Sequence, residues 1–127
     1  MPKVTVTLRK SYGGAHITMS CKQLRGDINY AWPSANIAVM GAEGAVQILY
    51  SKEINAIEDA QERAFLAEQK KKEYNELFCN PYNAASYGYI DDIIEPRNTR
   101  FRVIRALEQL AVKAQEMPWK KHDNMPL

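Results

Sequence analysis

Hydrophobic and polar positions alternate near the beginning of the chain, which is the pattern of a β-strand. Residues 4–8 alternate β-branched and apolar side chains and predict the first strand. Two short apolar runs, 29–32 and 36–40, predict two more strands, separated at Pro33 because proline cannot donate to a strand ladder. A last extended segment is predicted at 89–94.

Apolar residues at helical spacing occupy most of the remaining chain. The predicted helices span residues 14–23, 42–50, 56–78, 82–87 and 97–115. The segment from Met117 onward is expected to be extended or to dock on another surface. Together these elements predict an α/β fold that is rich in helix and has a few short strands. So few strands do not form the covered sheet that this number of helices implies, so we expect a piece of a larger domain.

Composition is that of an ordinary globular chain, with 127 residues, 46% hydrophobic and 25% charged positions. The formal charge of +2 does not favour a nucleic-acid partner or an anionic membrane surface. The apolar stretches are far shorter than the roughly 20 residues of a membrane-spanning helix, and residues 1–4 lack a signal-peptide core. Cys21 and Cys79 stand alone, which favours a reducing compartment and disfavours zinc. We therefore expect a cytoplasmic chain with no metal.

The most informative local feature is the segment from Ser11 to His16, Ser-Tyr-Gly-Gly-Ala-His, between a predicted strand and a predicted helix. Glycine lets the backbone adopt positive φ, and the first amides of a helix lack intrahelical partners. Two such amides directed at one point form an oxyanion hole, which binds a carbonyl oxygen that gains negative charge. The alternative is a tight turn from strand to helix with no ligand.

Other patterns carry less information. The phosphate-binding motifs with a Gly-x-Gly-x-x-Gly or Gly-Lys-Ser/Thr sequence are absent. His16 is a candidate general base, or a histidine without a chemical role. Asp91 and Asp92 resemble a carboxylate pair, but adjacent residues of an extended segment point to opposite faces, which favours solvated or salt-bridged roles. If the chain contributes to catalysis, backbone amides rather than a nucleophilic side chain would carry it.

A set of ordered motifs covers almost the whole chain, apart from the charged helix near 52–76. They are Arg9–Ala15, Leu24–Asp27, Tyr30–Ala35, Ile37–Gly41, Asn80–Tyr82, Asp91–Ile94, and the ending Pro118–His122 through Pro126–Leu127. In these motifs the chain resembles the carboxyltransferase (beta) subunit of propionyl-CoA carboxylase and related acyl-CoA carboxylases.

The resemblance implies a crotonase-like fold, with residues 1–127 as the C-terminal portion of the biotin-side carboxyltransferase domain. Family members are several times longer, and their active site lies at a dimer interface within an oligomer, a hexamer in the full-length family. There the carboxyl group moves from carboxybiotin to the α-carbon of an acyl-CoA such as propionyl-CoA. A carrier domain holds the biotin, and a biotin carboxylase subunit loads it.

The resemblance also implies roles for residues of the glycine turn. The backbone amides of Gly14 and Ala15 correspond to the biotin-side oxyanion hole, within a cofactor-binding segment that includes Tyr12, Gly13 and His16. Ile17 stands where the family lines its acyl pocket. Propionyl-type members usually read Tyr-Gly-Gly-Ala-Tyr-Asp, whereas His-Ile follows the alanine here, so a carboxylate is missing and the acyl preference stays open.

Two alternatives remain beside this hypothesis. One is the carboxyltransferase subunit of a sodium-pumping biotin decarboxylase of the methylmalonyl-CoA type, which runs the transfer in the opposite direction. The other is a non-catalytic crotonase-like assembly module. Because the acyl-CoA oxyanion hole of the family would lie upstream, we expect this chain alone to be inactive.

Overall fold

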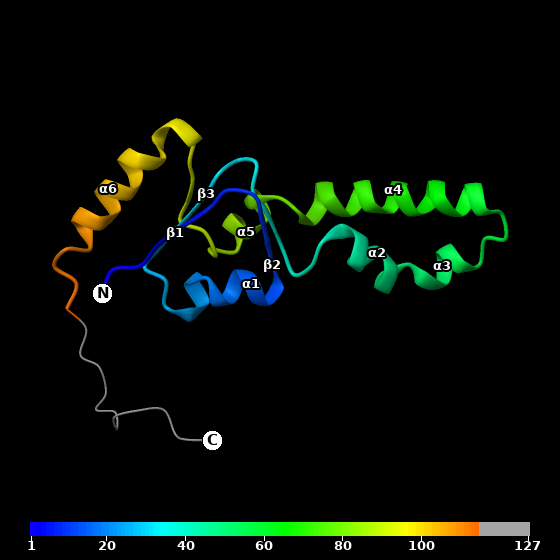
Figure 1. Ribbon diagram of the computed structural model, residues 1–127, viewed down its shortest axis with the longest axis horizontal. Coiled ribbons are helices and arrows are strands. Elements are labelled where there is room, and N and C mark those ends of the chain that lie inside the picture. The colour runs from blue at the N-terminus through cyan, green and yellow to red at the C-terminus, as the bar shows by residue number, and fades with distance from the viewer. Residues whose placement is uncertain (115–127) are drawn as a thin grey trace, which may run out of the picture.

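Two small parallel sheets form the centre of the computed structural model, which describes residues 1–114 (Figure 1). The first sheet has the order β1-β3-β5, with β1 (Val4–Thr7), β3 (Ile28–Ala31) and β5 (Asp92–Ile93). The second pairs β2 (Lys10–Tyr12) with β4 (Asn36–Ala38). Parallel pairing requires crossover connections, and these are supplied by the helices between the strands.

The helices are α1 (Gly13–Thr18), α2 (Ala42–Leu49), α3 (Ser51–Asn55), α4 (Ala60–Phe78), α5 (Pro81–Ser86) and α6 (Thr99–Gln109). Short 3₁₀ turns cover Lys22–Leu24 and Pro96–Asn98. This arrangement confirms the predicted α/β fold, rich in helix with a few short strands. No helix within residues 1–114 has the length and apolar character to cross a membrane.

Several boundaries differ from the predicted ones. The predicted helix 14–23 ends at Thr18, because Ser20 has a left-handed φ of 71° that stops a right-handed helix. The predicted helix 56–78 begins at Ala60, where the Asp59 side chain accepts a hydrogen bond from the Glu62 amide and caps the first turn. The expectation for the segment after Met117 lies outside the described residues.

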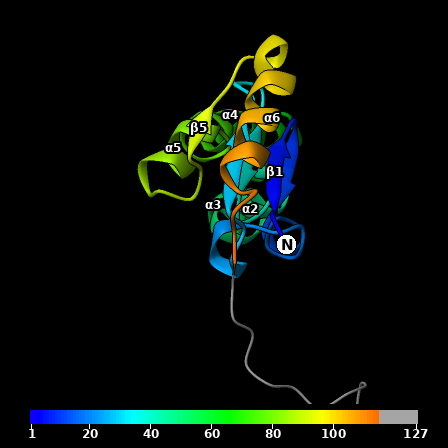
Figure 2. The ribbon, with the colours of Figure 1, turned by 90° about the vertical axis from the view of Figure 1, so that its left-hand side faces the viewer.

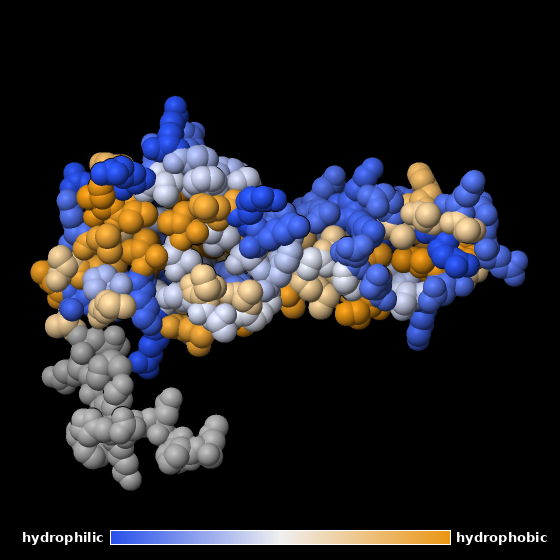
Figure 3. Space-filling view, viewed as in Figure 1, coloured by the Kyte–Doolittle hydropathy of each residue, from blue (hydrophilic) through white to orange (hydrophobic). Residues whose placement is uncertain are grey.

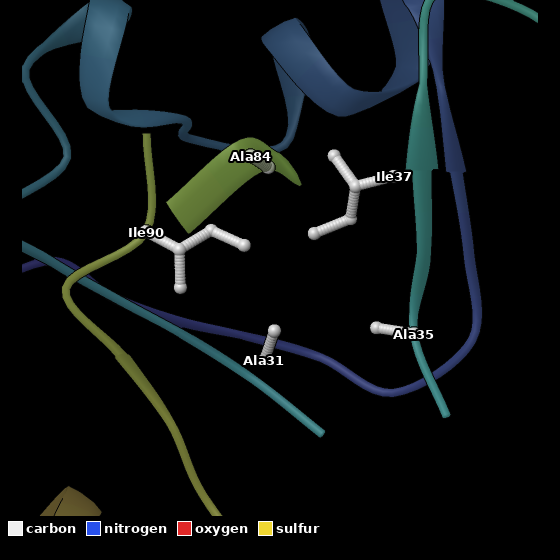
Figure 4. Packing of buried hydrophobic residues seen from close by; sticks show 5 residues of the cluster. All are labelled: Ala31, Ala35, Ile37, Ala84 and Ile90. Carbon is white, nitrogen blue, oxygen red and sulfur yellow. The ribbon is translucent and has the colours of Figure 1, made fainter. Parts of the chain in front are cut away.

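The buried residues form two clusters. One holds Ala31, Ala35, Ile37, Ala84 and Ile90, and it joins the end of β3 to β4 and α5 (Figure 4). The other packs α6 against the three-stranded sheet. Figure 2 shows α6 beside β1, which it contacts.

The second cluster is held by Tyr30, Ile94 and Ala106, with Trp32 packed against it. The Trp32 indole N–H donates a hydrogen bond of 2.8 Å to the Thr99 hydroxyl in the first turn of α6. Trp32 therefore anchors α6 against the sheet.

Helices α2, α3 and α4 form an arm that extends from the sheets (Figure 1). Ala42, Ala45 and Val46 of α2 are buried, whereas α4 has no fully buried residue. Large apolar side chains of α6 are exposed, among them Phe101 and Ile104. Figure 3 shows apolar surface at the end of the molecule opposite the arm.

Candidate functional site

The turn between β2 and α1 depends on Gly13. Its φ of +49° lies in the left-handed region, and a Cβ at this position would lie 2.9 Å from the Val39 carbonyl oxygen. The parallel pairing of Tyr12 with Ala38 brings the backbone of β4 this close. The turn therefore requires glycine at position 13 for both conformation and space.

The next two residues leave their backbone exposed. Gly14 and Ala15 lie in the first turn of α1, both are exposed, and a Cβ at Gly14 would meet no atom within 4 Å. No side chain caps α1, and its first turn holds no acidic residue. Among residues 1–114, neither amide donates to a backbone carbonyl. Two adjacent amides are thus free to bind one carbonyl oxygen.

A mostly apolar pocket of about 340 Å³ lies beside this turn. Gly13, His16 and Ile17 form one wall, and the segment Ile37–Val39 continues it. The rest of the lining comes from α4, α5, the loop after α5 and the 3₁₀ turn Lys22–Leu24, with the residues Tyr74, Phe78, Asn83, Ala84, Tyr87, Tyr89 and Gln23. Its size and character are those of a small-molecule site with a few polar groups.

His16 joins the turn to this pocket. Its Nδ1 lies 2.9 Å from the Ser11 hydroxyl in a hydrogen bond across the turn. Partial burial lowers the pKa of His16 below its ordinary value of 6.5, because the charged imidazolium loses hydration. Burial therefore favours the neutral form of the ring.

Of the predicted site residues Ile17 and Tyr12, the structure places only Ile17 in the pocket lining. Ile17 lines the pocket, although 44% of the residue is exposed. The Tyr12 ring instead packs against Gly41 at the start of α2, where a Cβ would lie 3.4 Å from Cε2 of the ring. Tyr12 therefore supports the turn from outside the pocket.

The aromatic wall of the pocket was not predicted. Tyr74 and Phe78 have ring centroids 5.0 Å apart, and Tyr87 stacks on Tyr89 at 6.0 Å. Helical periodicity assigned Tyr74 and Phe78 to the apolar face of a helix, with no sign that they meet α1. The concentration of tyrosines after the helix stop at Pro81 was the one available signal.

Asp91 and Asp92 do not form a paired carboxylate site. Asp91 pairs with Lys22 and also accepts a hydrogen bond of 2.8 Å from the Asn29 amide. Asp92 pairs with Arg102 of α6. This confirms the prediction that the two side chains diverge into structural salt bridges. Residues 1–114 contain no group of three side chains able to hold a metal ion.

The comparisons with known proteins agree with the α/β fold. The sequence profile of the carboxyl transferase domain matches residues 1–125. The chain belongs to this family. The resemblance to propionyl-CoA carboxylase beta subunits is thereby confirmed.

Two similar proteins illustrate the match. The propionyl-CoA carboxylase beta chain of Cereibacter sphaeroides is 53% identical over the whole chain, which spans 24% of that protein. The methylmalonyl-CoA decarboxylase alpha subunit of Propionigenium modestum is 47% identical, again over the whole chain and 24% of the relative. The chain therefore covers about a quarter of the length of these relatives.

A solved structure extends the agreement to three dimensions. A transcarboxylase 12S hexamer with methylmalonyl-coenzyme A and methylmalonic acid bound matches with a TM-score of 0.87 and 47% identity. The match covers all of this chain and 24% of the other. The fold is that of crotonase-like carboxyltransferases.

Proposed function

We propose that residues 1–127 form the C-terminal, biotin-side portion of a carboxyltransferase domain in a biotin-dependent acyl-CoA carboxylase. The observation that carries this proposal is the glycine turn, in which the backbone of Gly14 and Ala15 is exposed. Both residues lie in the part of the chain that matches the carboxyl transferase family. The whole protein would move a carboxyl group from carboxybiotin to the α-carbon of an acyl-CoA such as propionyl-CoA. The name of the Cereibacter sphaeroides relative supports that substrate.

The backbone of α1 provides the chemistry of this portion. In the proposal, the amides of Gly14 and Ala15 donate hydrogen bonds to the ureido carbonyl oxygen of biotin and stabilise negative charge on it. Biotin itself supplies the carboxyl group, as a mobile carrier. The exposed Gly14 backbone and the missing side-chain cap are compatible with a ligand that approaches from solvent. The positive end of the α1 dipole favours the same oxygen.

The pocket beside α1 is suited to binding the acyl group of the substrate. Ile17 and the aromatic wall offer apolar contacts to a short acyl chain. Without a carboxylate at position 17, we expect little discrimination against acyl groups with extra apolar atoms. The carboxylate of the usual propionyl-type motif is thus replaced by an apolar contact.

The proposed partners are those implied by the resemblance to acyl-CoA carboxylases. They are acyl-CoA, a biotin carboxyl carrier, a biotin carboxylase subunit and further copies of the chain in a dimer-based oligomer. The solved relative is described as a hexamer assembly with bound substrate, which supports the oligomer and the acyl-CoA ligand. We place the protein in the cytoplasm.

A decarboxylase of the methylmalonyl-CoA type is the second candidate. The Propionigenium modestum relative favours it, since it matches the entire chain at 47% identity. Both candidates would use the Gly14 and Ala15 amides on biotin and differ in the direction of transfer.

A chimaera tests the proposed function. Residues 1–127 would replace the matching 24% of the Cereibacter sphaeroides beta chain, which is 53% identical to them. With its biotin-carrying carboxylase partner, bicarbonate and ATP, the chimaera is expected to carboxylate propionyl-CoA. The isolated chain is expected to show no transfer. The unmodified beta chain serves as the positive control.

The outcomes separate the candidates. A chimaera that assembles like its parent but transfers no carboxyl group would contradict the catalytic proposal and favour an assembly module. Decarboxylation of methylmalonyl-CoA without carboxylation of propionyl-CoA would favour the second candidate. Carboxylation by the isolated chain would show that the site is complete within these residues.

A further inference from the structure

The hydrogen bond between Ser11 and His16 spans the glycine turn. Ser11 belongs to β2 and His16 to α1, and both side chains are half-buried. Tyr12 is the N-cap of α1. Ser11 directly precedes this cap, and His16 follows it by four residues. Apolar pairs at these positions fix the angle at which a chain enters a helix. Here a polar pair takes that place.

The direction of the bond follows from the hydrogen-bonding groups available. Within residues 1–114, His16 is the one hydrogen-bond partner of the Ser11 hydroxyl. If the hydroxyl donates to Nδ1, its proton is satisfied and the imidazole carries its own proton on Nε2. The reverse direction would leave the hydroxyl proton without an acceptor in this part of the chain.

The surroundings of His16 favour a neutral ring. It lines the pocket together with Tyr74, Tyr87 and Tyr89. On its other side, a second hollow is lined by Arg9 and Lys10, together with Ser11 and Cys21. Neither lining includes a carboxylate that would stabilise an imidazolium. The lowered pKa of His16, caused by burial, agrees with this arrangement.

We propose that Ser11 is a positioning residue that holds His16 as a neutral ring and presents its Nε2–H to a carbonyl oxygen in the pocket. The oxygen belongs either to the acyl thioester or to the ureido ring, which offer the same acceptor. The pocket is otherwise mostly apolar, so a single oriented donor selects where a carbonyl group sits. This inference rests on the proposed function for the identity of the ligand.

The first test reads the imidazole directly. The chain has two histidines, His16 and His122, so ¹⁵N-histidine NMR of the whole chain is assigned by His122→Gln. We expect His16 at neutral pH to carry its proton on Nε2. Ser11→Ala is expected to mix the two tautomers, whereas Ser11→Thr keeps the unmodified pattern. A His16 protonated on Nδ1, or a spectrum unchanged by Ser11→Ala, would overturn the pairing.

The second test identifies the carbonyl oxygen in the chimaera. His16→Phe removes the donor, and loss of one hydrogen bond is expected to raise one KM by about five- to tenfold. His16→Gln keeps an N–H near the position of Nε2 and is expected to restore most of that loss. A raised KM for propionyl-CoA assigns the thioester, and a raised KM for the biotinylated carrier assigns the ureido ring. If neither KM changes, His16 does not contact the ligand.

The two tests separate this inference from the proposed function. If the unmodified chimaera shows no transfer activity, the proposed function and the carbonyl ligand are both contradicted. The NMR result would still decide whether Ser11 positions His16. Normal transfer with a spectrum insensitive to Ser11→Ala would leave the function intact and overturn the positioning role.

Discussion

The two adjacent glycines of the turn have different roles. Gly13 has a φ of +49° and lies against the Val39 carbonyl oxygen, so any side chain there is strained. Gly14 has open space around its Cβ position and an ordinary backbone conformation. Gly13 therefore maintains the fold of the turn, and Gly14 leaves the backbone accessible to a ligand.

This difference predicts opposite effects on stability. Gly13→Ala is expected to destabilise the chain by about 1–3 kcal/mol, from a left-handed conformation and a close contact. Gly14→Ala is expected to leave stability unchanged or to raise it by up to about 1 kcal/mol, because alanine reduces the entropy of the unfolded chain. Urea unfolding followed by circular dichroism measures both. Equal destabilisation by the two substitutions would contradict the roles assigned to them.

At the residue scale, the sequence predicted the turn but not its surroundings. The Gly-Gly dipeptide has an intrinsic conformational preference, so its role was visible without a structure. The Ser11–His16 bond depends on where α1 begins, and the packing of Tyr74 near α1 depends on tertiary contacts. Neither follows from local spacing.

At the scale of elements, one carboxylate connects three segments distant in sequence. Asp27, just before β3, accepts hydrogen bonds of 2.6 and 2.9 Å from the Lys113 ammonium, which follows α6. It also accepts one of 2.8 Å from the Lys3 amide before β1. The bond from Lys113, the largest cause, and the Lys3 amide lower the pKa of Asp27, and partial desolvation opposes them.

A dependence of stability on pH follows from this arrangement. A carboxylate with a lowered pKa stabilises the fold above its unfolded pKa of about 3.8 and loses that contribution as pH falls through the folded value. Asp27→Asn is therefore expected to lower the urea midpoint at pH 7, with a difference from the unmodified chain that shrinks below pH 4. Glu108→Gln, in an exposed pair with Arg105, is the matched control. A difference that stays constant down to pH 3 would contradict the account.

The predicted elements agree with the structure where apolar periodicity is strong. β1 and α2 lie within the predicted ranges. β2 was missed because Lys10-Ser11-Tyr12 lacks an apolar alternation, and its strand conformation depends on pairing with β4. The predicted helix 97–115 also begins later, at Thr99, after a 3₁₀ turn.

At the scale of the whole molecule, the sheets of three and two strands support a single candidate site on α1. Parallel sheets are normally covered on both faces, whereas here large apolar residues such as Phe101 and Leu107 of α6 are exposed. The chain matches about a quarter of the length of its relatives. These features fit a portion that contributes one oxyanion hole to a larger active site.

The rate of carboxyl transfer by an Ala15→Pro chimaera tests the central claim most directly. Proline removes the amide of residue 15, and loss of one oxyanion donor is expected to slow transfer by about 100- to 1,000-fold. Ala15→Ser keeps the amide and is expected to stay near the unmodified rate. An ester bond in place of that amide, introduced with the α-hydroxy acid analogue of alanine, removes the same donor without the ring of proline. Both variants are expected to transfer the carboxyl group slowly although they fold and assemble. A near-normal rate in either would show that the Ala15 amide does not stabilise the reacting carbonyl oxygen.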